Sequence, residues 1–263
     1  MKTRRPRPGL AHRRRSKRMI GRRILKLVEI IFCVGVVGAF TYKFLEYAEG
    51  STDFQVRNVE IYGLRYLNGH DVWKASGITA TENILFFDSA DVQARIEAMP
   101  YVRTCRVERN FPDTVKLIIR EREPWATLMV NSRSYEIDDD GVVLRLYAPT
   151  EMPISPFFTE VGGLDFVEEG EVLEQPGLRS AMSLWRSFNA SALGEELTVS
   201  ELAVYDTDDI RMYCDELPYE LRWGRGNFDR QVHRLDVLWE ELDGVLGCSQ
   251  YLDLRFDSDL VCM

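Results

Sequence analysis

The sequence predicts an α+β protein in which a single transmembrane helix precedes a β-α-α-β-β domain and a mainly antiparallel β domain with two helices. Three observations support this class. One apolar segment lies near the N-terminus, the next block alternates strands and helices as a small layered domain does, and short strands dominate the rest. The charge is uneven as well. Residues 1–26 carry twelve Lys and Arg and no acidic residue, whereas the remainder has a net charge of −21.

The apolar segment Leu27–Leu45 is expected to cross a membrane. As a helix it would be about 28 Å long at ~1.5 Å per residue, close to the ~30 Å thickness of a hydrocarbon core. Lys and Arg beside a span stay on the cytoplasmic side. We therefore assign 1–26 to a basic cytoplasmic tail, 27–47 to the transmembrane helix, and 48–263 to an exported region.

Other interpretations of this region stay open at this stage. Val37–Ala39 is compatible with a signal-peptide cleavage site, and Arg22-Arg23 loosely resembles a twin-arginine export signal. The long basic head and the apolar residues after Ala39 favour an uncleaved anchor. The basic head could also neutralise nucleic-acid phosphates, but it has no aromatic residue to stack on bases. Contact with anionic lipid explains the same charges, so dedicated nucleic-acid binding is not expected.

Residues 54–123 predict the first exported domain. Gly77 and Pro100 are typical helix ends, and Asp88 or Ser89 is a suitable N-cap. The expected elements are, in order, a strand at 54–62, helices at 68–75 and 88–98, and strands at 102–111 and 113–123. Two helices can cover one face of such a three-stranded sheet.

Residues 124–263 predict a second, mostly β domain. Phe228–Leu242 has the clearest helical spacing of apolar residues in the chain, and 177–189 is a second helix. A proline-rich segment at 149–156 indicates a loop. Strands are expected at 125–130, 134–137, 142–146, 202–205, 210–214, 219–223, 251–256 and 260–262.

The exported region offers few residues for catalysis. Only His70 and His233 are available there, and no His-x-x-x-His, Cys-x-x-Cys, Gly-x-Ser-x-Gly or phosphate-binding glycine loop occurs. Residues 136–141 imitate a calcium loop, but Tyr147 stands where the bidentate Glu belongs, and Asp140-Gly141 is better explained as a hairpin turn. We therefore expect no catalytic residues, no metal site, no cofactor and no small-molecule substrate.

The cysteines leave two possibilities open. Cys105, Cys214, Cys248 and Cys262 lie in the exported region, and four cysteines permit three pairings. An exported compartment is oxidising, so one bridge is plausible. A body of this size can also bury a core without disulfides, so buried free thiols are equally compatible.

Several stretches together resemble the FtsQ/DivIB family of bacterial cell-division proteins. Residues 54–123 resemble its POTRA (polypeptide-transport-associated) domain, and 124–263 resemble its β domain. The resemblance rests on the stretches 54–63, Met99–Val102, Arg109–Val115, Arg120–Ala126, Ile137–Val143 and Leu252–Phe256. Each stretch alone is weak, but the order of basic tail, span, one POTRA domain and this β domain is specific.

The resemblance implies a non-enzymatic scaffold of the division septum, anchored in the bacterial cytoplasmic (inner) membrane. Such proteins help to recruit and regulate the septal peptidoglycan synthase through the partners FtsB and FtsL. FtsB adds a strand to the terminal β edge, and an edge strand does offer unpaired backbone groups. The residues that match this contact are Arg255, Phe256, Ser258, Leu260, Val261 and Cys262.

Two departures from the family pattern occur at this edge. The family chain often continues a few residues beyond the last strand, whereas this one stops at Met263, and Asp259 replaces the usual Gly after the Asp-Ser turn. We expect Phe256→Ala or Val261→Pro to weaken an FtsB-like contact without unfolding the protein. The alternative function is a POTRA-bearing protein of polypeptide transport or envelope assembly, although the repeated POTRA blocks and long barrel usual in those proteins do not occur.

Overall fold

The computed structural model describes residues 11–256 and 260–263, with side chains from residue 25 onward. The described chain divides into two compact units. The first contains the residues up to 58 together with 79–87 and 109–115, and the second contains 59–78, 88–108 and 116–263.

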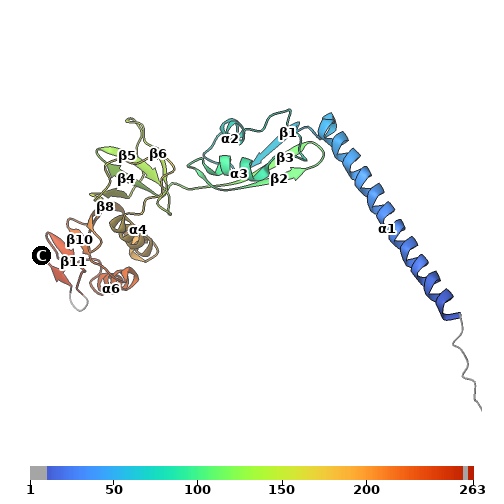
Figure 1. Cartoon of the computed structure of the whole chain (residues 1–263). Helices are drawn as coiled ribbons and strands as arrows, with labels where there is room; N and C mark the ends of the chain where they lie inside the picture. The colour runs from blue at the N-terminus through green and yellow to red at the C-terminus, as the bar shows by residue number, and fades with distance from the viewer. Residues whose placement is uncertain (1–10, 257–259) are drawn as a thin grey trace, which may run out of the picture. The chain divides into compact units, whose positions relative to one another are not determined.

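The first unit is built on the long helix α1 (Ala11–Gly50), shown in blue in Figure 1. Within it, Leu25–Gly50 is the one described segment that is long and apolar enough to cross a membrane. This finding agrees with the expected single span. A short 3-10 helix, η1 (Thr52–Phe54), follows α1, and the segments 79–87 and 109–115 lie beside its end.

A three-stranded sheet with the order β1-β3-β2 follows, formed by β1 (Asn58–Tyr62), β2 (Val102–Asn110) and β3 (Thr114–Glu121). Helices α2 (Gly69–Ser76) and α3 (Ser89–Glu97) connect β1 to β2 and pack against each other. The expected order β-α-α-β-β is confirmed.

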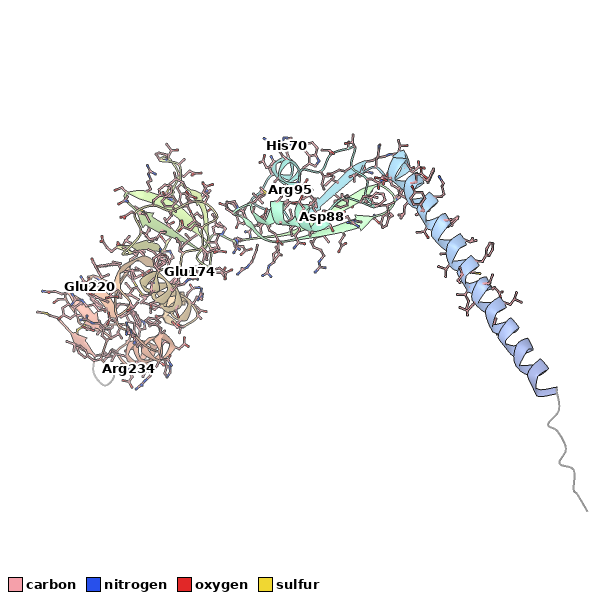
Figure 2. All side chains as sticks on the ribbon, viewed as in Figure 1. His70, Asp88, Arg95, Glu174, Glu220 and Arg234 are labelled. Atoms are coloured by element: carbon pink, nitrogen blue, oxygen red, sulfur yellow. A yellow bond between two sulfur atoms is a disulfide. The ribbon has the colours of Figure 1, made fainter. Side chains whose placement is uncertain are left out.

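Local sequence signals explain where these two helices begin and end. The side chain of Asn68 accepts a hydrogen bond from the His70 amide at the start of α2. Asp88, labelled in Figure 2, accepts hydrogen bonds from the amides of Ala90 and Asp91 in the first turn of α3. Gly77 ends α2 with a φ of 65°, a conformation that glycine adopts without steric cost.

The second sheet has nine strands in the order β12-β11-β10-β9-β8-β7-β4-β5-β6. Five neighbouring pairs are antiparallel, and the pairs β4–β7, β7–β8 and β10–β11 are parallel. The strands are β4 (Ala126–Val130), β5 (Arg133–Ile137), β6 (Val143–Leu146), β7 (Phe157–Thr159), β8 (Val199–Asp206), β9 (Asp209–Cys214), β10 (Glu220–Trp223), β11 (Tyr251–Asp253) and β12 (Val261–Cys262).

Helices α4 (Pro176–Asn189) and α6 (Phe228–Glu241) pack against each other, and α4 also contacts β8 (Figure 1). A short helix, α5 (Leu193–Glu196), follows α4. The core between helices and sheet is apolar, and its largest fully buried side chains include Trp223, Phe158 and Phe188. The two helices expected from apolar spacing are therefore confirmed.

Several expected elements differ in extent, among them β1 and β11, and one strand was not expected. β1 begins at Asn58 rather than residue 54, because Phe54 and Val56 bond to the 82–84 segment instead of the sheet. β11 ends at Asp253, because the Asp253 carboxylate accepts from the Arg255 amide and turns the chain. β7 was not expected; it directly follows the segment 149–156, which was expected as a loop. It contains only three residues, which is too short to show an alternating pattern.

The structure resolves the cysteine question that the sequence leaves open. Cys248 and Cys262 form a disulfide, while Cys105 and Cys214 are free and buried. Burial raises the pKa of the Cys105 thiol to about 11 and that of Cys214 to about 12. Both thiols therefore stay protonated and unreactive at neutral pH.

Candidate functional site: the C-terminal sheet edge

β12 is the last strand at one edge of the nine-stranded sheet. It runs antiparallel to β11, with Cys262 opposite Leu252 and Val261 opposite Asp253. No other strand of the described residues pairs with its outer side. The strand therefore presents a free backbone edge, although it is only two residues long.

The register shows which backbone groups face outward. Tyr251 and Met263 exchange both backbone hydrogen bonds, with N···O distances of 3.1 and 3.4 Å. Hydrogen-bonded and non-hydrogen-bonded pairs alternate along an antiparallel ladder. The next pair, Cys262 with Leu252, is thus non-hydrogen-bonded, and the N–H and C=O of Cys262 face away from β11. Those of Val261 face inward to Asp253.

This register corrects one sequence-based expectation. Val261→Pro was expected to weaken an FtsB-like contact and to leave the fold intact, because proline removes a donor from the ladder. Because the Val261 amide faces β11, Val261→Pro removes a donor from the sheet's own ladder instead. Cys262 is the residue whose amide can serve a partner strand.

Exposed apolar side chains surround the free edge. Phe256 is 50 % exposed, Val261 41 % and Met263 56 %, whereas Leu260 packs partly against the core. Ser258, the remaining expected contact residue, lies outside the described residues. Val261 and Cys262 thus form the edge strand itself, Phe256 follows the end of β11, and Leu260 precedes β12 and packs against the core.

Arg255 is held by a buried acid on the same segment. Its Nη2 lies 2.7 Å from Oδ2 of Asp253, and its Nε lies 3.0 Å from Oδ1. Burial raises the pKa of Asp253, but hydrogen bonds and charge from Arg255 outweigh this effect, so its pKa lies below the usual value. The charge of Arg255 is therefore already paired before any partner arrives.

Further contacts fix the chain on both sides of β12. Arg234 of α6, labelled in Figure 2, donates to the carbonyl oxygen of Phe256 at 2.7 Å. The amides of Ser249 and Gln250 donate to the Met263 carbonyl at 2.8 and 2.6 Å. The disulfide joins Cys262 to Cys248, in the loop after α6. These contacts together hold the end of the edge strand in place.

The opposite edge of the sheet, β6, is covered by residues 169–173. The Val143 amide donates to the carbonyl of Glu171 at 2.9 Å, and the Val143 carbonyl accepts from Gly170 at 2.7 Å. Leu173 donates to the carbonyl of Gly141 at 2.9 Å, and Leu146 donates to the Glu169 carboxylate at 3.2 Å. This edge has little left to offer a partner strand.

The acidic turn at 138–140 is surrounded by arginines, which distinguishes it from a cation site. Its carboxylate oxygens lie close together, but Arg103 of β2 and Arg122, the residue after the end of β3, already pair with them. Arg122 lies 2.7 Å from fully buried Asp138, and Arg103 lies 3.3 Å from Asp139 and 2.5 Å from Asp140. Asp138 also accepts from the amides of Asp140 and Val142, which shapes the expected turn.

Sequence analysis did not identify two residues of this site. Cys248 lies far from β12 in the chain, and pairing cannot be deduced from four cysteines alone. Asp253 stands two residues before Arg255 in a strand pattern, where alternation places both on one face. That spacing was a usable signal for the ion pair.

Comparison with known proteins finds family models that match two parts of the chain after α1. The family model "POTRA domain, FtsQ-type" matches residues 54–122, and "Cell division protein FtsQ/DivIB, C-terminal" matches 126–255. The second match ends just before Phe256 and β12.

Curated relatives agree with these two models. "Cell division protein FtsQ" of Anaeromyxobacter sp. is 27 % identical over 239 residues, covering 90 % of this chain and 78 % of the relative. The protein of the same name from Syntrophotalea carbinolica is 26 % identical over 201 residues, covering 76 % and 70 %. That of Caulobacter vibrioides is 29 % identical over 126 residues, covering 48 % and 42 %.

Proposed function

Because the chain belongs to the FtsQ/DivIB family of cell-division proteins, we propose that it is a non-enzymatic scaffold of the division septum. In this role it bridges divisome membrane proteins resembling FtsB and FtsL, and it helps to recruit and regulate septal peptidoglycan synthesis. The observation that carries the proposal is the free edge of β12, with the outward backbone groups of Cys262 and exposed Phe256 and Val261 beside it.

The free edge suits strand addition. An extended partner segment gains main-chain hydrogen bonds from an edge strand, and pockets or apolar neighbours select its side chains. The disulfide and the bonds to Met263 hold β12 in place before binding, so a partner does not bear the entropy cost of ordering it. Phe256, Val261 and Met263 supply the apolar contact area.

The same proposal places the protein in the cytoplasmic membrane. α1 serves as a single span at 27–47, the basic tail 1–26 stays in the cytoplasm, and the domains 54–123 and 124–263 face the periplasm or exterior. The uneven distribution of Lys and Arg supports this orientation. The Cys248–Cys262 disulfide is in keeping with an oxidising compartment for the second domain.

Localisation tests the cellular role. A fluorescent protein fused to the cytoplasmic N-terminus should form a ring at midcell in dividing cells, and depletion of the protein should give filaments. Uniform fluorescence around the envelope through the cell cycle would contradict a septal scaffold. It would instead suit the transport or assembly alternative, which the comparisons do not favour.

Binding of the FtsB-like partner tests the edge itself. Phe256→Ala should weaken binding about tenfold or more, because exposed aromatic side chains often anchor interfaces. Phe166→Ala, also at an exposed phenylalanine of the second unit, is the matched control and should bind like the wild type. Equal affinities for all three proteins, each with an unchanged unfolding midpoint, would exclude Phe256 from the contact.

A further inference from the structure

Two loops of the first exported domain carry exposed aromatic side chains close to the end of α1. Phe86 is 51 % exposed and Phe111 is 56 % exposed. Both belong to the same compact unit as α1, because 79–87 and 109–115 group with the helix rather than with the rest of the domain. Two exposed phenylalanines in one compact unit are candidates for an interaction surface.

The first loop is attached directly to the helix. The Asn83 side-chain amide donates to the carbonyl oxygen of Ala48 at 2.7 Å, and Ala48 is fully buried beneath the loop. The amide of Phe86 donates back to the carbonyl of Asn83 at 3.0 Å. Phe86 thus lies one turn away from a residue that holds the end of α1.

The second loop is attached through the segment that follows the helix. The carbonyl of Asp113 accepts from the Arg57 amide at 2.8 Å, and the Arg57 guanidinium donates to the carbonyl of Thr52 at 3.3 Å. Phe111 stands two residues before Asp113, at the tip of the β2–β3 turn. Figure 1 shows this turn beside the end of α1.

Distances along the helix place these loops at the height of the lipid headgroups. If the span covers 27–47, the backbone of Ala48 rises only ~1.5 Å above its last residue. The headgroup region adds about 5–8 Å to each side of the hydrocarbon core. Groups that hydrogen-bond to Ala48 therefore begin inside that layer, where aromatic rings are favoured.

The local charge indicates an apolar contact. Residues 44–58, 79–87 and 109–115 contain five acidic and two basic residues. This surplus of acid gives no attraction to anionic headgroups, so burial of the two rings must supply the contact energy. Such a contact should change little with salt.

We propose that Phe86 and Phe111 form a second lipid-binding surface, which inserts into the exported-side headgroup layer beside the span and holds the segments 79–87 and 109–115 against the bilayer. The proposal rests on the proposed function only in requiring that α1 be a membrane span.

Labelling of the full-length protein in lipid nanodiscs tests this surface. In a Cys33→Ala background, Phe86→Cys and Phe111→Cys are each labelled with an environment-sensitive dye. Buried Cys105 and Cys214 stay unlabelled, which also reports that each variant is folded. Met152→Cys, at a 91 % exposed residue of the second unit, is the matched control. Native Cys33 in α1 is labelled separately to report insertion of the span.

Dyes at 86 and 111 should lose emission to quenchers near the lipid headgroups, at low and high salt alike, while the dye at 152 should not. Suppose that quenchers deep in the bilayer quench the dye at Cys33, but that the dyes at 86 and 111 are quenched no more than the dye at 152. The lipid-binding surface is then excluded, while α1 is still a membrane span. If the dye at Cys33 is not quenched, the span itself fails. Protection of 86 and 111 only after addition of a protein partner would assign the surface to that partner.

Discussion

The nine-stranded sheet ends in two different ways. At β6, residues 169–173 satisfy the outer backbone groups through bonds to Gly141, Val143 and Leu146. At β12, no described strand or loop bonds to the outward amide of Cys262, and apolar side chains stand exposed around it. One edge is closed by the chain itself, whereas the other is short and has no further partner among residues 11–256 and 260–263.

This difference is why we propose β12, and not β6, as the edge that binds a partner. Proteins usually cover or disrupt edge strands, because a free edge pairs with other chains indiscriminately. At β12 a disulfide and hydrogen bonds to Met263 order the free edge before any partner binds, so the edge is suited to pairing. Its length of two residues limits unspecific pairing, since a long flat edge is the main hazard.

The largest expected effect comes from the disulfide of the open edge. In Cys248→Ala/Cys262→Ala the loop between two residues 14 apart is no longer closed. We expect the free energy of unfolding to fall by about 3 kcal/mol, and binding of the FtsB-like partner to weaken because β12 loses its order. Denaturant unfolding of the oxidised wild type and the variant measures this. A change below about 0.5 kcal/mol would mean that the disulfide does not hold the edge.

A smaller effect is expected at the covered edge. Gly170 has a φ of 86°, and its amide bonds to Val143. Gly170→Ala should cost about 1–2 kcal/mol, because a side chain is disfavoured in this conformation, and it should loosen the cover of β6. Unfolding and size-exclusion chromatography measure stability and any new self-association. Gly162→Ala is the control, because this glycine has ordinary φ and open space around it, and it should be neutral. Equal stability of the two variants would show that the cover does not depend on Gly170.

The smallest effect concerns the ion pair beside the open edge. The pKa of Asp253 is lowered in the fold, so its contribution to stability is present above the unfolded value of about 3.9 and is lost as the pH falls through the lower folded value. Because Arg255 is more than one-third exposed, we expect Asp253→Asn to cost about 1 kcal/mol or less at pH 7. Urea unfolding at several pH values should show the difference from wild type shrinking below pH 4. If the difference in the free energy of unfolding stayed constant with pH, the Asp253–Arg255 ion pair would be excluded as its source.

Much of the fold could be predicted from the sequence where local physics is strong. The apolar spacing in 228–242 identifies α6, Asp88 and Gly77 mark helix ends, and alternation identifies most strands. β7 could not be found in this way. Its three residues gain their structure from pairing with β4 and β8 on either side, which is a tertiary effect.

The candidate site was only partly predictable. Resemblance and position at the chain end indicated Phe256 and Val261, but the direction of each amide depends on register, which no local pattern fixes. The proline test at Val261 was misdirected for this reason. The partner of Cys262 was likewise undetermined until the fold brought the loop after α6 against β12.

Hydrogen exchange at two neighbouring amides tests the open edge most directly. In the free protein the amide of Val261, bonded to β11, should exchange slowly, and that of Cys262 should exchange fast. Saturation with the FtsB-like partner should slow exchange of the Cys262 amide at least tenfold and leave the exchange rate of the Val261 amide unchanged. The reason is that an added strand accepts a hydrogen bond only from the outward amide. Fast exchange at Cys262 in the saturated complex, measured by NMR on the wild-type protein, would show that no strand is added at this edge.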